Sequence, residues 1–211
     1  EFMQVLIVGA GFAGAVIARE LAEKHRCEIT LIDKRDHIAG NAYDPVHPNT
    51  GQRYHKYGPH IFHTNSADIV DYLSQFTTWL PYQHKVQAVL PGGMAAPMPI
   101  NRVTLNTHYG VELTDEQAMR DFLDKVRVPN DKPANALEYL QSVYGVELAE
   151  LFFGRYTRKM WGLDMLDMPV SVVARLPVRY GNEVDYFNDE YQCMPADGYL
   201  ALFERLLDHP N

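Results

Sequence analysis

The N-terminal part of the chain combines apolar runs with a glycine-rich turn in an order typical of a parallel α/β sheet. Residues 4–8 form a short apolar run rich in β-branched side chains, which indicates a buried strand. Apolar side chains then recur at helical spacing over residues 12–24, and a second apolar run covers residues 28–33. Strand, turn, helix and strand within roughly thirty residues predict a βαβ-type unit and the fold class α/β.

The middle of the chain follows a different pattern. Residues 86–90 and 96–100 flank the Gly92-Gly93 dipeptide and predict a β-hairpin. Elsewhere apolar positions recur every three or four residues, and several of these segments begin with residues that cap helices. Helices are predicted at residues 66–76, 114–126, 134–144, 147–161 and 199–206. A mainly helical block is therefore expected as an insertion after the N-terminal unit.

Composition and charge narrow the class of protein. Hydrophobic residues are 46% and charged residues 22% of the chain, as in a globular protein. The formal net charge of −8 disfavours binding to a phosphate backbone, so no nucleic-acid partner is expected. Cys27 and Cys193 lie far apart, which predicts neither a disulfide framework nor a zinc site and favours a reducing cytoplasm. The longest uncharged apolar stretch, residues 5–18, is too short to insert across a membrane.

The glycine-rich turn carries a dinucleotide-binding fingerprint. Gly9, Gly11 and Gly14 match G-x-G-x-x-G between the predicted strand and helix, where backbone approaches a pyrophosphate. Asp33 ends the second strand, where a carboxylate accepts ribose hydroxyls and disfavours the 2′-phosphate of NADP. An arginine at position 35 and small residues at 39–40 are similar to flavoproteins of the glutathione-reductase type, which favours FAD over NAD.

Two histidines, His60 and His63, lie in a segment expected to be extended over residues 56–64. A strand places these positions on opposite faces, so they do not chelate one metal ion, and no metal site is predicted. They either form hydrogen bonds within the core or line a flavin, and both alternatives stay open.

Residues 151–161 contain four aromatic and three basic side chains. On an α-helix Phe152 and Tyr156 are neighbours and form one continuous aromatic surface. Such a surface can stack a uracil ring while nearby cations contact a diphosphate. The alternative is an amphipathic core helix with a solvated basic face, which periodicity alone favours. The cationic and phenolic side chains at positions 175, 179, 180 and 186 either hold phosphates or form surface ion pairs.

Together these segments resemble the UDP-galactopyranose mutase family. The resemblance rests on GAGFAGAV (9–16), RDHIAGNAY (35–43), KYGPHIFHT (56–64), residues 156–162, RLPVRY (175–180) and DYFNDEYQCMPADGY (185–199). It implies a Rossmann-type FAD-binding domain with an inserted helical domain and part of an antiparallel sheet domain. The expected boundaries are 3–80 for the FAD-binding portion, 81–110 for a sheet segment, 111–170 for a helical substrate domain, and 171–211 for a sheet segment and an incomplete return to the FAD domain.

The resemblance also implies an activity, a cofactor and a substrate. Such enzymes are isomerases that interconvert UDP-galactopyranose and UDP-galactofuranose, with reduced FAD as the active form and attack of its N5 atom on the anomeric carbon. A UDP-sugar is the expected partner, and assembly of identical subunits stays open. Two rival readings are an FAD-dependent oxidoreductase of the amine-oxidase type and a nucleotide-binding fragment without catalysis. UDP-arabinopyranose or a dTDP-hexose stay open as alternative substrates.

Functional residues follow by position from the same resemblance. The catalytic residues implied are Arg175, His63 and Trp161. The FAD-binding residues implied are Gly9, Gly11, Phe12, Ala13, Gly14, Asp33, Lys34, Arg35, Gly40, Asn41, His60 and Ile61. The substrate-binding residues implied are Phe152, Phe153, Tyr156, Thr157, Trp161, Arg175 and Tyr186.

The sequence departs from the family pattern in two ways. Ala39 stands where the family usually has the first glycine of a Gly-Gly pair. The family chain is also considerably longer, and its later part supplies a second essential arginine, substrate-binding tyrosines and the last flavin-binding segment. We therefore expect a truncated N-terminal portion that is not a competent mutase alone.

Overall fold

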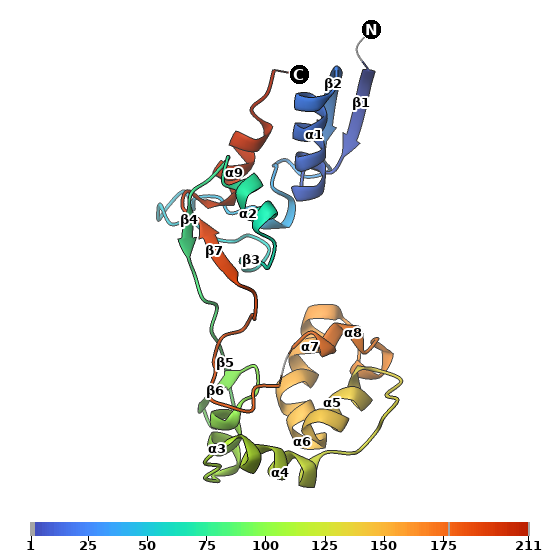
Figure 1. Cartoon of the computed structure of the whole chain (residues 1–211), viewed down its shortest axis with the longest axis vertical. Coiled ribbons are helices and arrows are strands. Elements are labelled where there is room, and N and C mark those ends of the chain that lie inside the picture. Colours follow the sequence, from blue (N-terminus) through green and yellow to red (C-terminus); the bar gives the residue numbers. More distant parts are fainter. Residues whose placement is uncertain (1–2, 177, 211) are drawn as a thin grey trace. The chain divides into compact units, whose positions relative to one another are not determined.

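The computed structural model describes residues 3–176 and 178–210, so Pro177, inside the RLPVRY motif, lies outside the described residues. The chain divides into two compact units (Figure 1). Unit 1 comprises Glu1–Gln83 and Phe187–Asn211, and unit 2 comprises His84–Tyr186. Each unit has its own core of buried apolar side chains.

Unit 1 begins with the predicted strand–helix–strand unit. Strand β1 (Met3–Val8) and strand β2 (Cys27–Ile32) pair in parallel, with Met3 opposite Cys27 and Val8 opposite Ile32. Helix α1 (Phe12–Lys24) connects them, and its buried residues are all small, namely Gly14, Ala15, Ala18 and Ala22. Small side chains allow the helix to lie close against its neighbours, which confirms the α/β fold class and the predicted unit.

A second, antiparallel sheet completes unit 1. Strand β7 (Tyr191–Pro195) lies between β3 (Phe62–Thr64) and β4 (Trp79–Pro81). Helices α2 (Ala67–Leu73) and α9 (Gly198–Leu207) accompany this sheet, and a 3₁₀ turn covers Gly40–Ala42. The ring centroids of Phe12 on α1 and Phe203 on α9 are 4.6 Å apart, so α9 packs against the helix that follows the glycine turn.

The start of α9 is held by a carboxylate from a distant part of the chain. Asp44 is buried, and its two carboxylate oxygens accept hydrogen bonds from the backbone N–H groups of Tyr199 (2.8 Å) and Leu200 (2.7 Å). The residue in the N-cap position, Asp197, makes no capping bond with its own side chain. Asp44 therefore satisfies the N–H groups that a helix leaves unpaired in its first turn.

Unit 2 joins a hairpin to a helical block. Strands β5 (Val86–Val89) and β6 (Ala95–Met98) pair antiparallel around Gly92 and Gly93, both with positive φ, which confirms the hairpin. The helices are α3 (Arg102–Tyr109), α4 (Glu116–Val126), α5 (Ala136–Tyr144), α6 (Val146–Leu148), α7 (Arg155–Trp161) and α8 (Ser171–Ala174). A π-helical turn, Ala149–Gly154, joins α6 to α7, and a 3₁₀ turn covers Met165–Asp167.

Two features of unit 2 differ from the sequence-based expectation. Helix α3 lies within the stretch expected to be a sheet segment, because buried Asn101 accepts a hydrogen bond from the Thr104 N–H and so starts a helix. The helix expected over residues 147–161 is interrupted by the π-helical turn. No helix among the described residues is both long enough and apolar enough to cross a membrane.

Candidate functional site

The glycine turn of unit 1 is built by close contacts that exclude side chains. Gly9 has φ of +110°, a conformation that favours glycine. A Cβ atom on Gly14 would lie 1.8 Å from the carbonyl oxygen of Gly9, so only glycine fits beneath the turn. Gly11 has no such obstruction, since its nearest neighbour would be the Cα of Gly40 at 3.8 Å. The structure thus brings Gly40 beside Gly11, as expected of two segments of one binding site.

Asp33 braces this turn from the end of β2. Its carboxylate oxygens accept hydrogen bonds from the backbone N–H of Ala10 (2.7 Å) and of Arg35 (2.9 Å). These bonds, the one from Arg35 first, lower the pKa of Asp33 below its usual value. Each oxygen keeps a second lone pair, so the carboxylate remains able to accept a ribose hydroxyl. Bracing of the turn is a second role that the sequence did not reveal.

The segment after Asp33 arranges its side chains around Arg35. The guanidinium donates a hydrogen bond to the Asn41 side chain (2.8 Å) and lies 4.2 Å from the centre of the Tyr57 ring. Lys34 is exposed. Ala39 is buried with φ of +72°, and its N–H donates to the Ala10 carbonyl (2.9 Å). A left-handed backbone at position 39 is the conformation that glycine adopts without strain, which gives a physical reason for a glycine there.

The two predicted histidines occupy different settings. The expected extended segment over residues 56–64 is a strand only at Phe62–Thr64, so His60 and Ile61 precede it. The ring of His60 hydrogen-bonds the Gly58 carbonyl (3.1 Å). His63 lies on β3 and pairs with the carboxylate of Asp189 (2.7 Å).

These groups fit a bound dinucleotide. The first turn of α1, whose residues are all described, contains no acidic side chain that would repel a pyrophosphate. Its N-terminal N–H groups follow Gly11 directly, and Ala13 is exposed. Phe12 and Ala13 also border an apolar groove of about 580 Å³ between α1, β3 and α2. The cofactor-binding residues of unit 1 therefore stay a prediction that this geometry supports.

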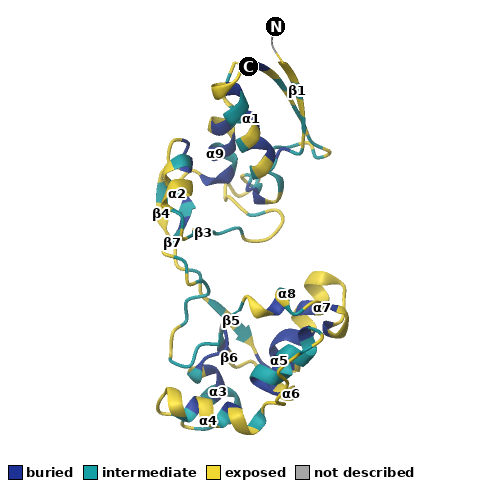
Figure 2. Ribbon diagram, turned by 45° about the vertical axis from the view of Figure 1, so that its right-hand side comes forward, coloured by how far each residue is buried: buried dark blue, intermediate teal, exposed yellow. Residues whose placement is uncertain are grey.

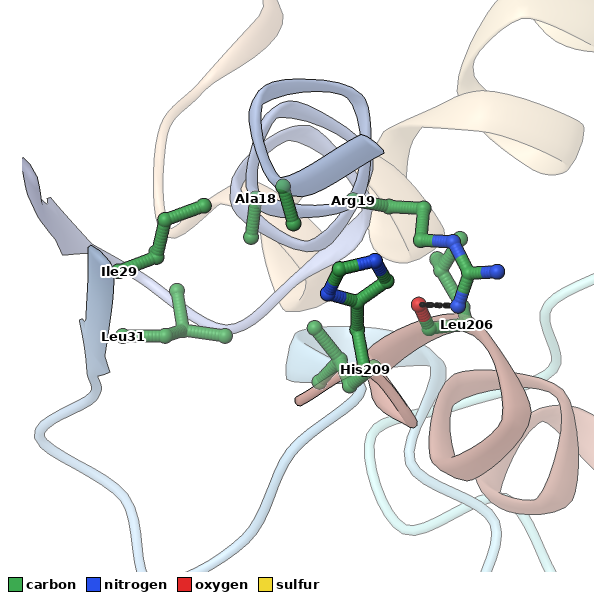
Figure 3. A pocket seen from close by; sticks show the side chains of 8 residues that line it. Ala18, Arg19, Ile29, Leu31, Leu206 and His209 are labelled. Carbon is green, nitrogen blue, oxygen red and sulfur yellow. Dashed lines mark hydrogen bonds between the residues drawn. The ribbon is translucent and has the colours of Figure 1, made fainter. Parts of the chain in front are cut away.

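A second cavity in unit 1, of about 410 Å³, lies away from the predicted site (Figure 3). Ile29 and Leu31 from β2 face Ala18 of α1 across it, and Arg19 donates a hydrogen bond to the Leu206 carbonyl (3.4 Å) at its rim. None of the predicted site residues lines it.

In unit 2, the aromatic side chains of the predicted substrate segment separate into two groups. Tyr156 and Trp161 are 62% and 53% exposed, whereas Phe152, Phe153 and Thr157 are buried. Figure 2 shows α7 mostly in the colour of exposed residues. The expected continuous surface of Phe152 and Tyr156 is wrong, because the π-helical turn widens the spacing and puts Phe152 and Thr157 on the buried side.

Two predicted substrate-binding side chains, Arg175 and Tyr156, act electrostatically on a third, Tyr186. Burial raises the pKa of the Tyr186 phenol, the Arg175 guanidinium opposes this shift, and the Tyr156 phenol adds to it. Arg175 follows α8, and its Nε donates a hydrogen bond to the Val172 carbonyl (3.1 Å). A guanidinium can donate several hydrogen bonds to phosphate oxygens, and a phenol can donate one.

The basic side chains of α7 are not equivalent. Arg158 is paired with Asp164, whose carboxylate accepts from both Nε and Nη2. Arg155 and Lys159 are exposed on the same helix. Arg158 is therefore engaged in a surface ion pair within unit 2.

Comparisons with known proteins agree with this arrangement. A model described as an NAD(P)-binding Rossmann-like domain matches residues 7–76, and the UDP-galactopyranose mutase model matches residues 151–211. A probable UDP-galactopyranose mutase of Klebsiella pneumoniae is 39% identical over 98% of this chain and 53% of that protein. The dTDP-fucopyranose mutase of Escherichia coli is 38% identical over 99% of this chain and 55% of that protein.

Solved structures show the same fold. A reduced UDP-galactopyranose mutase matches with a TM-score of 0.75 at 19% identity, over 100% of this chain and 47% of that chain. Cyclohexylamine oxidase from Brevibacterium oxydans matches with a TM-score of 0.58 at 15% identity, over 99% of this chain and 49% of that chain. The chain spans about half the length of the curated relatives it matches. Over its whole length the chain is thus similar to about half of a UDP-galactopyranose mutase, in sequence and in fold.

Proposed function

We propose that unit 1 binds FAD and that unit 2 binds a UDP-sugar, as parts of a flavin-dependent nucleotide-sugar mutase. The observation that carries this proposal is the exposed ring of Tyr156 together with the Arg175 charge that acts on the Tyr186 phenol, because an aromatic face and a guanidinium suit a nucleoside diphosphate. Relatives named UDP-galactopyranose mutase and dTDP-fucopyranose mutase support the reaction class. The cytoplasmic location stays a prediction.

Unit 1 would hold FAD through backbone more than through side chains. The pyrophosphate would lie against the glycine turn at the start of α1, and Asp33 would accept a ribose hydroxyl while it braces the turn. Gly40 and Asn41 would border the same place, since Gly40 touches Gly11. Reduced FAD, when bound, supplies the nucleophile for the anomeric carbon.

Unit 2 would hold the UDP portion. The exposed ring of Tyr156 offers a stacking surface for uracil, and the Arg175 cation would stabilise the charge of the departing diphosphate. Phe152, Phe153 and Thr157 would support the site from the core. Trp161, half exposed at the end of α7, would flank the sugar.

An amine-oxidase-type oxidoreductase shares the glycine turn and the fold. Arg175 and the exposed Tyr156 ring argue against it, because oxidation of an amine needs neither a diphosphate contact nor a surface that stacks a uracil ring. A mutase and an oxidase differ in whether the reaction consumes electrons or an electron acceptor overall. A mutase returns the flavin to its starting state in each cycle, whereas an oxidase consumes an electron acceptor.

The proposal is tested in a chimera in which residues 3–210 of this chain replace the equivalent half of the Klebsiella relative. With dithionite present, we expect conversion of UDP-galactofuranose to UDP-galactopyranose, measured by chromatography. Arg175→Ala should abolish turnover and keep the flavin, whereas Arg158→Ala, the matched control on α7, should keep both. Full turnover in Arg175→Ala, or turnover that requires oxygen, would contradict the proposal.

A further inference from the structure

A cluster of aromatic rings in unit 1 surrounds Tyr57, a residue of the KYGPHIFHT motif that is not among the predicted site residues. The Nδ1 atom of His37 lies 2.7 Å from the Ile38 carbonyl oxygen, and its Nε2 atom lies 2.7 Å from the Tyr57 hydroxyl. A carbonyl oxygen only accepts, so Nδ1 carries the proton and the Tyr57 hydroxyl donates to Nε2 of the neutral ring. The His37 ring stacks on Tyr43, with centroids 3.7 Å apart and an interplanar angle of 8°. Tyr57 is therefore held in place, although the residue is 39% exposed.

The guanidinium of Arg35 lies over the Tyr57 ring. The Arg35 Cζ atom is 4.2 Å from the ring centroid, a distance at which an aromatic face attracts a cation. The Nη2 atom of the same guanidinium donates to the Asn41 side chain (2.8 Å). Among the residues that the structure describes, Nε and Nη1 of Arg35 have no hydrogen-bond partner. A ring against one face and an amide at one edge thus hold the guanidinium and leave its remaining donors for a ligand.

Contacts within unit 1 connect this guanidinium to the predicted dinucleotide site. The backbone N–H of Arg35 donates to one oxygen of Asp33 (2.9 Å), while the other oxygen of Asp33 braces the glycine turn (2.7 Å). These two hydrogen bonds lower the pKa of Asp33, and the positive charge of Arg35 adds to the effect although burial opposes it. Asn41 follows Gly40, whose added Cβ atom would lie 3.0 Å from the Gly11 Cα. Arg35 is therefore linked both to the acid that would accept a ribose hydroxyl and to the turn that would receive the pyrophosphate.

We propose that Tyr57 is a positioning residue that holds the Arg35 guanidinium where it contacts the adenosine diphosphate half of the bound dinucleotide. The proposal deepens the proposed function and rests on dinucleotide binding by unit 1. A guanidinium offers N–H donors to phosphate oxygens and a planar face to a purine ring, but a free arginine side chain loses rotamer entropy when a ligand fixes it. Tyr57 fixes the side chain before the ligand arrives, so less entropy is lost on binding.

Calorimetric titration of the purified chain with ADP and with FAD tests this role. Tyr57→Leu removes the ring beneath the guanidinium and should weaken the binding of both ligands about tenfold, because the ligand itself then has to fix Arg35. Tyr57→Phe keeps the ring and loses only the hydroxyl, so both affinities should stay within about threefold of the wild type. Tyr54→Leu is the matched control, since Tyr54 is 42% exposed in the same segment and its ring contacts His47 instead. Its affinities should equal those of the wild type.

A double-mutant cycle with Arg35→Met separates positioning of Arg35 from a general effect on the fold. Arg35→Met alone should weaken ADP binding at least as much as Tyr57→Leu does, and this titration decides the contact without any change at residue 57. In the Arg35→Met background, Tyr57→Leu should weaken ADP binding by no more than about twofold, because the side chain through which Tyr57 acts is already gone. Thermal unfolding checks that each variant is folded. A tenfold loss from Tyr57→Leu in both backgrounds, or equal losses in Tyr57→Phe and Tyr57→Leu, would overturn the proposal.

The two ligands distinguish failure of this role from failure of the proposed function. A wild type that binds ADP but not FAD would contradict flavin binding, while the ADP titrations still decide the role of Tyr57. A wild type whose FAD affinity is unchanged by Tyr57→Leu would overturn the role of Tyr57 and leave FAD binding intact. A loss for FAD without a loss for ADP would overturn the placement of Arg35 at the adenosine diphosphate half. A wild type that binds neither ligand would contradict both.

Discussion

Replacement of Gly14 by alanine tests the account of the glycine turn at the position where the structure leaves least room. The new Cβ would lie 1.8 Å from the Gly9 carbonyl oxygen, 3.1 Å from the Gly9 carbonyl carbon and 3.3 Å from Ile7 Cγ2. Two of these atoms belong to the backbone, so no side-chain rotation relieves the contact. Helix α1 and the turn have to separate by about 1 Å, in a region packed as densely as a crystal.

The cost follows from known effects of overpacking. Insertion of a methyl group into a rigid core costs about 1–3 kcal/mol, and a backbone obstruction lies at the upper end. For a chain of this length a loss of about 3 kcal/mol lowers the melting temperature by roughly 6–12 °C. The separated turn would also lose the geometry that receives a pyrophosphate, so FAD binding should disappear with stability.

Gly11→Ala is the matched control. Gly11 has φ of −84°, and its Cβ would meet only the Cα of Gly40 at an ordinary distance of 3.8 Å. We expect a change in unfolding free energy of at most about 0.5 kcal/mol but a large loss of FAD affinity, because the methyl group stands where the phosphates approach. Thermal unfolding and FAD titration of both variants measure this contrast. Equal melting temperatures for Gly14→Ala and the wild type would refute the reasoning.

Three further predictions concern other parts of the two units. Asp44→Ala should lower the unfolding free energy by about 3 kcal/mol in urea titrations, because it leaves one buried and one partly buried N–H group of α9 unpaired. Asp197→Ala should cost less than about 1 kcal/mol, and equal losses for the two variants would contradict this. Phe152→Ala should lower the unfolding free energy by about 3–5 kcal/mol, because it truncates a core side chain. Tyr156→Ala should leave stability unchanged but weaken UDP binding in calorimetry. An unchanged UDP affinity would show that the α7 side chains only pack against the core and do not bind UDP. Burial lowers the pKa of His55 below its usual 6.5, so the unfolded chain binds the proton more tightly and stability falls as the pH drops below 6.5. His55→Gln should flatten that fall in urea titrations at several pH values, and an identical pH profile would exclude His55 as its cause.

The pattern of apolar and turn-forming residues predicted an element correctly wherever residues close together in the chain determine its structure. The βαβ-type unit at the N-terminus was predicted to within a residue or two, because strand, turn and helix each leave their own spacing in the sequence. The hairpin around Gly92 and Gly93 was predicted for the same reason, since both glycines take the positive φ that a tight turn needs.

The same pattern gave wrong predictions where the helical period or the hydrogen-bond partners of a segment depend on the rest of the fold. Helix α3 was missed because its start depends on Asn101, which is buried and bonded within the folded unit. The separation of Phe152 from Tyr156 was missed because a π-helical turn has the same composition as an α-helical one. A helical period assumed from sequence therefore assigns such residues to the wrong face.

The carboxylates that organise unit 1 were missed for another reason. Asp44 contacts Tyr199 across 155 positions, and Asp189 contacts His63 across 126 positions. No spacing rule relates residues so far apart, although both pairs lie inside or beside segments that carry the family resemblance. The motifs of the family resemblance predicted which segments form the site, whereas the structure shows which side chains hold those segments together.

The central claim is that unit 1 forms an FAD site, and the visible absorption spectrum of the purified chain tests it most directly. The chain is incubated with FAD, excess cofactor is removed on a desalting column, and the spectrum is recorded beside that of Gly11→Ala. The account predicts a flavin band retained by the wild type in proportion to protein and lost in Gly11→Ala. A wild-type chain that is folded by circular dichroism but retains no flavin would contradict it.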